Sequence, residues 1–285
     1  MRAPFLALVR PRAAQSRAGT PIEKRFLRQD FGGVLNIGFG RRTVCCSSVV
    51  IGLAVWLCGG LTVTAQYKKP GSPAPLLYSG NESGTFRIYF SGAEIGQEKF
   101  QIIESGPSVK ASAETRLTIE RDKEKVSFLI RPVLEFNRFF EPVSYEIGQE
   151  SGPNKTKARV TFRGAMSDAV YENGKETDAR QIDLQKDVLV LDDNVFHQYI
   201  ILAKRYDFAK GGIQEFSAFV PQQFIAGGVS VSDKGMEAVQ VLSQNLKLQH
   251  LLVDTGELQI SLWLDDRHSV RKLAVPKSGV EVVRE

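Results

Sequence analysis

LDDNVFHQYIILAKRY, residues 191–206, is the stretch of this 285-residue chain that decides its fold. Its apolar side chains recur at helical spacing and cover more than half the circumference of a predicted helix. Asp192 or Asp193 can cap the start, while Lys204 and Arg205 lie in the last turn, where a cation opposes the negative end of the helix dipole. So wide an apolar surface has to be wrapped by other elements, and a concave sheet can do this.

Short strands with alternating apolar and polar side chains account for most of the remaining sequence. This alternation is typical of a half-buried antiparallel strand with one solvated face. About a dozen such strands follow one another at the spacing expected of a sandwich or barrel. We therefore predict a mainly β fold, in which a curved antiparallel sheet, a half-barrel or open barrel, wraps around one central helix. An N-terminal signal or anchor helix is expected before it.

The strand predicted at 110–120 leaves space above the sheet. Its inward residues are Ala111, Ala113, Thr115, Leu117 and Ile119, of which the first three are small. Either the 191–206 helix fills this space, or a ligand cavity remains beside the helix. The residues expected to line the space are Ala111, Ala113, Phe128, Tyr199 and Phe224.

Several short motifs predict turns. Asn173-Gly174 is the strongest hairpin signal in the chain. The pentapeptide EIGQE occurs at 94–98 and again at 146–150, and each copy is expected to be a strand end with a turn or bulge that its glycine permits. FIAGG, residues 224–228, reads as an apolar loop that is either a lid or a plain connection.

The first 77 residues differ from the rest. Residues 1–40 are Arg-rich and aperiodic, which predicts a disordered tail or an incorrectly extended translation start. Residues 41–65 have the order of a signal peptide, namely two arginines, an apolar middle and a small-residue cleavage signal that ends at Ala65. Residues 66–77 form a Pro-rich linker, and the β domain is expected to occupy 78–285.

The uncharged run allows two locations. Cleavage near Ala65 would release the β domain into the periplasm or the extracellular space. Without cleavage, residues 43–65 are long enough to cross the inner membrane as an anchor, and membrane contact would then run through them. All three cysteines of the chain, Cys45, Cys46 and Cys58, lie in this run, so the β domain has no disulfide or thiolate site.

The charge distribution argues against a nucleic-acid partner. The chain has a formal charge of +5, but residues 1–65 hold nine of its 37 basic residues and only two of its 32 acidic residues. The remaining 28 basic and 30 acidic residues leave the β domain near neutral. It therefore lacks the basic surface that phosphate binding needs.

The three histidines allow a complete check for a histidine site. We expect His197 to be solvated on the least apolar face of the helix, with an acid/base pairing to Asp192 or Asp193 as the alternative. His250 is expected to be buried and bonded to a neighbour, and His268 to lie in a polar turn. No nucleophile elbow, phosphate loop or dinucleotide motif is present, so we predict a non-enzymatic protein without cofactor or metal.

Three segments resemble the uncharacterised exported β-domain families of bacteria. They are GTFRIYFSGAEIGQEKFQI at 84–102, VLDDNVFHQYIIL at 190–202 and ISLWLDDRHSVRKLAVPKSGVEVVRE at 260–285. More distantly the chain is similar to periplasmic lipoprotein-carrier half-barrels, whose curved sheet holds helices and an acyl chain on its concave side. Those carriers have more than one helix there, whereas this sequence has one strong helix. No functional residue can be transferred from either family.

The resemblance implies two functions. In the first, the chain is a cell-envelope protein that binds a lipid-like or other apolar ligand on the concave side of the sheet. In the second, it is a structural or interaction protein of the envelope that has a partner protein but no ligand cavity.

Overall fold

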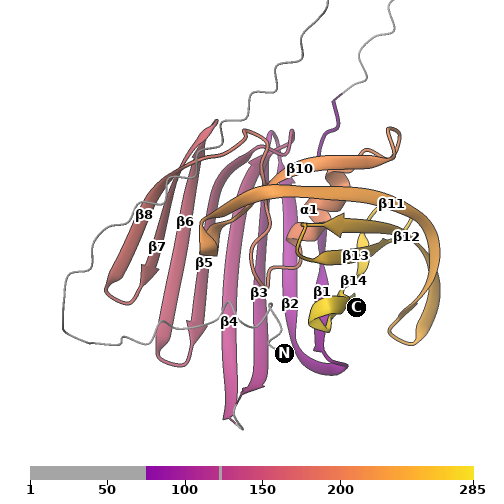
Figure 1. Ribbon diagram of the computed structural model, residues 1–285, viewed down its shortest axis with the longest axis horizontal. Helices are drawn as coiled ribbons and strands as arrows, with labels where there is room; N and C mark the ends of the chain where they lie inside the picture. Colours follow the sequence, from indigo (N-terminus) through magenta and orange to yellow (C-terminus); the bar gives the residue numbers. More distant parts are fainter. Residues whose placement is uncertain (1–74, 122–123) are drawn as a thin grey trace, which may run out of the picture. The chain divides into compact units, whose positions relative to one another are not determined.

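A computed structural model describes residues 75–121 and 124–285 (Figure 1). The predicted extension at 1–40, the signal or anchor at 41–65 and most of the 66–77 linker lie outside these residues. One sheet of 15 strands dominates the described part. The strands are β1 (Glu82–Phe90), β2 (Ala93–Ser105), β3 (Ser108–Arg121), β4 (Glu124–Asn137), β5 (Pro142–Ser151), β6 (Asn154–Arg163), β7 (Met166–Asn173), β8 (Glu176–Asp183), β9 (Leu189–Val190), β10 (Ile213–Val220), β11 (Ile225–Val241), β12 (Gln244–Asp254), β13 (Gln259–Leu264), β14 (Val270–Val275) and β15 (Val280–Arg284).

The sheet is curved and open. Its strand order is β8-β7-β6-β5-β4-β3-β2-β1-β15-β14-β13-β12-β11-β10-β9, so β8 and β9 are the two edge strands. Neighbouring strands pair antiparallel, apart from the short parallel pair of β9 and β10. The exposed edge strand β8 carries charged side chains, which discourage pairing with another chain. The predicted mainly β, open antiparallel fold is confirmed at this level.

The first and last strands pair in the middle of the sheet. β1 and β15 are neighbours, with Phe86 opposite Arg284 and Phe90 opposite Val280. Glu82, at the start of β1, forms ion pairs with Arg284 at 2.5 Å and with Lys204 of the helix at 3.3 Å. The sequence pattern could not predict this pairing, because alternation carries no information about the partner of a strand.

One α-helix, α1 (Gln198–Arg205), lies against the inner face of the sheet; two short 3₁₀ helices, η2 (Pro221–Gln223) and η3 (Pro276–Ser278), interrupt connections. Ile200, Leu202 and Ala203 are buried in the same apolar cluster as side chains from strands of both halves of the sheet. Helix and sheet therefore share one core. No helix in the described residues is long and apolar enough to cross a bilayer.

The predicted helix was too long. Helix α1 begins at Gln198, and residues 191–197 form an irregular segment in which Asn194 has a φ of 59°. The predicted capping by Asp192 or Asp193 is wrong, because His197 is the N-cap residue and makes no side-chain cap. The predicted cations of the last turn, Lys204 and Arg205, are confirmed. The apolar residues in 191–197 are buried in an irregular segment. The sequence pattern alone cannot distinguish such a segment from a buried helix.

The predicted inward face of the 110–120 strand is confirmed at its buried positions, and one predicted loop is wrong. Residues 111, 115 and 117 of β3 are buried on one face as expected, and Asn173-Gly174 joins β7 to β8. The predicted FIAGG loop is the start of a strand instead. Phe224 has a left-handed backbone after η2, and Ile225 then begins β11, which pairs with β10 from the first residue.

The β11–β12 hairpin bends over the outer face of the sheet. The pairing register shifts between Asp233 and Gly235, and Gly235 has a φ of 84° that favours glycine. The far part of the hairpin then packs Leu248 against Val283 in a second, smaller apolar cluster. Because Val282 belongs to the main core and its neighbour Val283 to this cluster, the two clusters lie on opposite faces of β15.

The two EIGQE copies have different environments. Gly96 lies at the β1–β2 register shift, where a Cβ would stand 1.9 Å from the carbonyl oxygen of Arg116 on β3. Gly148 sits in regular pairing within β5, with no atom within 4 Å of the corresponding position. The expected bulge is therefore confirmed at the first copy and wrong at the second.

We expect Gly96→Ala to lower the free energy of unfolding by about 3 kcal/mol, because backbone atoms of β3 would have to move. Gly148→Ala is the matched control, and its effect should stay within about 0.5 kcal/mol. Urea unfolding followed by circular dichroism measures both. Equal effects of the two substitutions would contradict this assignment.

Candidate functional site

A buried carboxylate holds the start of α1. Glu98 of β2 is fully buried, and its Oε1 accepts a hydrogen bond from the backbone N–H of His197 at 2.7 Å and contacts His197 Nδ1 at 3.1 Å. Its Oε2 accepts from the backbone N–H of Phe196 at 3.0 Å and from Thr115 Oγ1 at 2.9 Å. A carboxylate at a helix start accepts hydrogen bonds from free backbone amides, and its negative charge is stabilised by the positive end of the helix dipole. Glu98 therefore has the capping role that was predicted for Asp192 or Asp193.

A second buried carboxylate ties the irregular segment to the sheet. Asp192 Oδ2 accepts a hydrogen bond from the Tyr145 hydroxyl on β5 at 2.8 Å. Its Oδ1 accepts from the backbone N–H of Asp193 at 3.0 Å and of Gln222 at 3.3 Å, while its own N–H donates to Gln198 Oε1 at 2.6 Å. The segment before α1 is thus bonded to β5, η2 and the helix itself.

Burial controls the ionisation of this region. Desolvation, with repulsion from Asp193 as a smaller cause, raises the pKa of Asp192 to about 7. Desolvation also raises the pKa of Tyr145 well above its ordinary value, with a further increase from the Asp192 charge. Asp192 therefore exchanges its proton near neutral pH.

This group of side chains could in principle serve as an acid/base site, but it is closed to solvent. Glu98, Thr115, His197 and Gln198 have no exposed surface, and each Glu98 oxygen already has two partners. A substrate would have to displace the helix to reach them. The arrangement therefore has a structural role, in which the buried Glu98 attaches the start of the helix to the sheet. We call this attachment the Glu98 lock.

The histidines differ from expectation at two positions. The predicted solvated His197 is wrong, because the ring is fully buried beside Glu98 and stacks over Phe100. His250 has a neighbour as expected, with Nδ1 at 2.9 Å from Glu237 and its ring stacked on Trp263, but it is half-buried where full burial was expected. His268 lies in the predicted turn. The described residues contain no group of three or more acidic, histidine or cysteine side chains placed to bind a metal.

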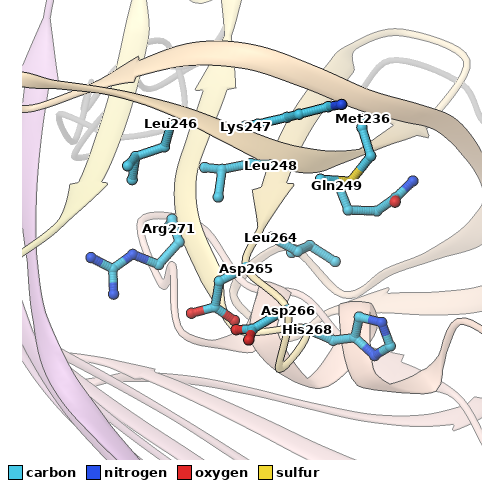
Figure 2. Close-up of a pocket in the computed structure, with 10 residues that line it drawn as sticks. All are labelled: Met236, Leu246, Lys247, Leu248, Gln249, Leu264, Asp265, Asp266, His268 and Arg271. Carbon is cyan, nitrogen blue, oxygen red and sulfur yellow. The ribbon is translucent and has the colours of Figure 1, made fainter.

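A groove of about 560 Å³ lies where the β11–β12 hairpin separates from β13 (Figure 2). Residues before Gln249 in β12 pair with β11 alone, since the pairing of β12 with β13 ends at Gln249 and Leu264. The β13–β14 turn forms the opposite wall. The lining residues are Met236, Leu246, Lys247, Leu248, Gln249, Leu264, Asp265, Asp266, His268 and Arg271.

Both positively and negatively charged side chains line this groove, and they form no ion pairs with one another in the described residues. Lys247, Asp266 and Arg271 make no ion pair or side-chain hydrogen bond with any described residue. One oxygen of Asp265 accepts from the backbone N–H groups of Arg267 and Ser269, both at 3.0 Å, and so shapes the turn. Figure 2 shows the carboxylates of Asp265 and Asp266 on the wall opposite Leu246 and Leu248. The groove therefore combines an apolar wall with cationic and anionic groups.

The five residues predicted to line a concave space lie elsewhere than in this groove. Ala111 and Phe128 are buried in the main core. Ala113, Tyr199 and Phe224 are partly buried and pack against it, and Phe224 also lies beneath the Arg180 guanidinium at 4.7 Å. Helix α1 shares this core, which corresponds to the alternative in which the helix fills the space. None of the five lines the groove.

Sequence reasoning missed Glu98, Tyr145 and the groove. A signal for Glu98 was present, because it has the same strand parity as the inward residues Phe100 and Ile102. A carboxylate at an inward position has to find buried donors. The groove had no such signal, since it depends on where two hairpins separate.

Comparison with known proteins finds a likeness in structure. No family model matches the chain, and no curated protein matches its sequence. Among solved structures, the chain is similar to a DUF1089 family protein from Pseudomonas aeruginosa, with 13% identity and a TM-score of 0.40, over 61% of this chain and 87% of that one. At this score the likeness carries no conclusion about function.

Asp192 should make stability depend on pH. Its pKa is about 7 in the folded chain against an ordinary 3.8, so between these values the unfolded chain has lost a proton that the folded chain keeps. Stability should therefore fall as the pH rises from about 4 to about 7, by up to about 4 kcal/mol. Asp192→Asn should remove most of this slope in urea unfolding at pH 5 and pH 8, and an unchanged slope would contradict the assignment.

Glu98→Ala should cost at least about 3 kcal/mol of unfolding free energy, because two buried backbone amides lose their acceptor. Glu98→Gln keeps one carbonyl oxygen and should cost less. The matched control is Glu150, which closes the second EIGQE copy and forms only exposed ion pairs with Arg131 and Lys155. Glu150→Ala should change stability by less than about 1 kcal/mol. If Glu98→Ala and Glu150→Ala lower the free energy of unfolding by similar amounts, the Glu98 lock is excluded.

Proposed function

We propose that this chain is a non-enzymatic protein of the cell envelope that binds a lipid-like amphiphile in the groove between the β11–β12 hairpin and the β13–β14 turn. The groove is the observation that carries the proposal. Its volume of about 560 Å³ suits a small molecule or a single acyl chain. The export signal predicted at 41–65 supports the location.

The lining of the groove supports an amphiphile over a purely apolar ligand. Met236, Leu246 and Leu248 offer a surface for a hydrocarbon chain, next to Arg271 and Asp266, whose charges have no partner among the described residues. Because both signs are present, a zwitterionic head group could find a partner for each of its charges, whereas an anionic head group would also face the two aspartates. We therefore favour a single-chain zwitterionic amphiphile as the ligand class.

Binding is favoured over catalysis because the titratable side chains around Glu98 and Asp192 serve the attachment of α1. Their oxygens are occupied by hydrogen bonds within the fold, and the groove residues Asp265 and His268 help to form a turn. A binding protein needs a shaped surface with suitable polar groups, and this the groove supplies.

The chain contains a convenient reporter of ligand binding. Trp263 is one of its two tryptophans, and it packs in the outer cluster with Leu246 and Leu248, which also line the groove. In the full chain with Trp56→Phe, monomeric dodecylphosphocholine should change Trp263 fluorescence saturably. Leu246→Asp should abolish the change, and Arg271→Gln should weaken binding about fivefold through loss of one charge-assisted hydrogen bond.

Two controls locate the ligand. Ile213→Asp changes an exposed apolar side chain outside the groove and should leave binding intact. If Phe224→Ser weakens binding while Leu246→Asp does not, the ligand lies on the concave side as the sequence suggested. Absence of any saturable signal with dodecylphosphocholine or laurate would favour an envelope interaction protein without a ligand.

A further inference from the structure

Exposed apolar side chains gather at one end of the sheet. Ten large apolar residues of the described part are exposed, and six of them belong to what we call the apolar end: Leu76, Leu77, Ile103, Phe139, Val143 and Met166. The turns between β2 and β3, β4 and β5, and β6 and β7 lie at this end, because successive strands run antiparallel (Figure 1). The chain also enters here, since the Tyr78 N–H donates to the carbonyl oxygen of Arg138 in the β4–β5 turn at 2.8 Å.

The β4–β5 turn places one phenylalanine inward and one outward. Phe140 has a φ of 64°, which is unusual for a bulky residue, and is buried against Tyr78 and Phe136. Phe139 is 56% exposed at the tip of the turn. The turn therefore buries one phenylalanine and displays its neighbour to solvent, where it adds to the exposed apolar side chains of this end.

Three ion pairs of opposite charge lie around the apolar end, next to the single exposed carboxylate of Asp183 opposite Met166. Arg138 lies 3.1 Å from Glu104, Lys186 lies 2.8 Å from Glu141, and Arg163 lies 3.2 Å from Asp168. Paired charges leave little net field, so this surface does not select an anionic partner. Its contact should depend on apolar burial and hardly on salt concentration.

The chain that precedes the apolar end identifies its partner. The uncharged run at 43–67 ends seven residues before the described part begins at Pro75. Seven residues span at most about 25 Å when extended. In the uncleaved alternative, in which this run is the membrane anchor, the apolar end is therefore held within about the same distance of the lipid surface. We propose that the apolar end rests on the surface of a lipid bilayer, with Phe139 and Leu77 inserted among the acyl chains.

This proposal is independent of the groove, because the groove is lined by β11–β14 and the apolar end by residues before β8. Loss of amphiphile binding in the groove would leave the bilayer contact untouched. The two can therefore fail separately.

The test uses the full chain, with residues 1–74 intact, inserted into phosphatidylcholine vesicles. Trp56→Phe and Trp263→Phe remove the natural tryptophans, and Phe139→Trp places a reporter at the apolar end. Vesicles with brominated acyl chains should quench this reporter about twofold or more relative to unbrominated vesicles, as expected for a ring at the boundary of the acyl chains. The quenching should persist at high salt concentration.

Pro153→Trp in the same background is the matched control, since the β5–β6 turn lies at the opposite end of the sheet, and it should not be quenched. Hydrogen exchange of residues 138–141 in the unmodified chain gives a second measurement, with slower exchange expected in vesicles than in detergent. If the Phe139→Trp reporter is unquenched by brominated lipid and still reached by acrylamide, the proposal is overturned. It is also overturned if that reporter is shielded from acrylamide without lipid, because another part of the chain or a second copy would then cover it.

Discussion

The contact between the Glu98 carboxylate and the backbone amides before α1 is the constraint on which the rest of the fold depends. It joins β2 to residues 98 and 99 positions later in the chain, and it does so in the interior, where water cannot replace either partner. The contact therefore holds the start of the helix against the inner face of the sheet. The ion pairs of Glu82 with Arg284 and Lys204 join β1 to β15 and to the last turn of the same helix.

The inner face, the outer face and one end of the sheet contact different groups. The inner face packs against α1 and holds the buried hydrogen bonds of Glu98 and Asp192. The outer face carries the bent β11–β12 hairpin, which buries Leu248 against Val283 and leaves the groove beside the β13–β14 turn. The end that receives the chain at Pro75 displays Phe139 and its apolar neighbours. A ligand site and a bilayer contact can coexist on such a sheet because they use separate surfaces.

The alternation of side chains along a strand was predicted more reliably than the start of the helix. Ala111, Thr115 and Leu117 point inward as predicted, because the side chains of a strand alternate whatever its partners are. The helix was predicted seven residues too early, and His197 was placed in solvent. Both errors have one cause, namely that an inward Glu98 supplies from a distant strand the cap that a local aspartate was expected to supply.

The sequence by itself determined the strand pattern, the single amphipathic helix, the near-neutral β domain and the uncharged run before it, since each follows from periodicity or composition along the chain. Only the tertiary structure decided that β1 pairs with β15, that Gly96 and Gly148 have unlike roles in identical pentapeptides, and where the groove opens. The physical reason is that these features depend on which backbones meet across the sheet. Two identical segments can face a close carbonyl oxygen in one place and open space in the other.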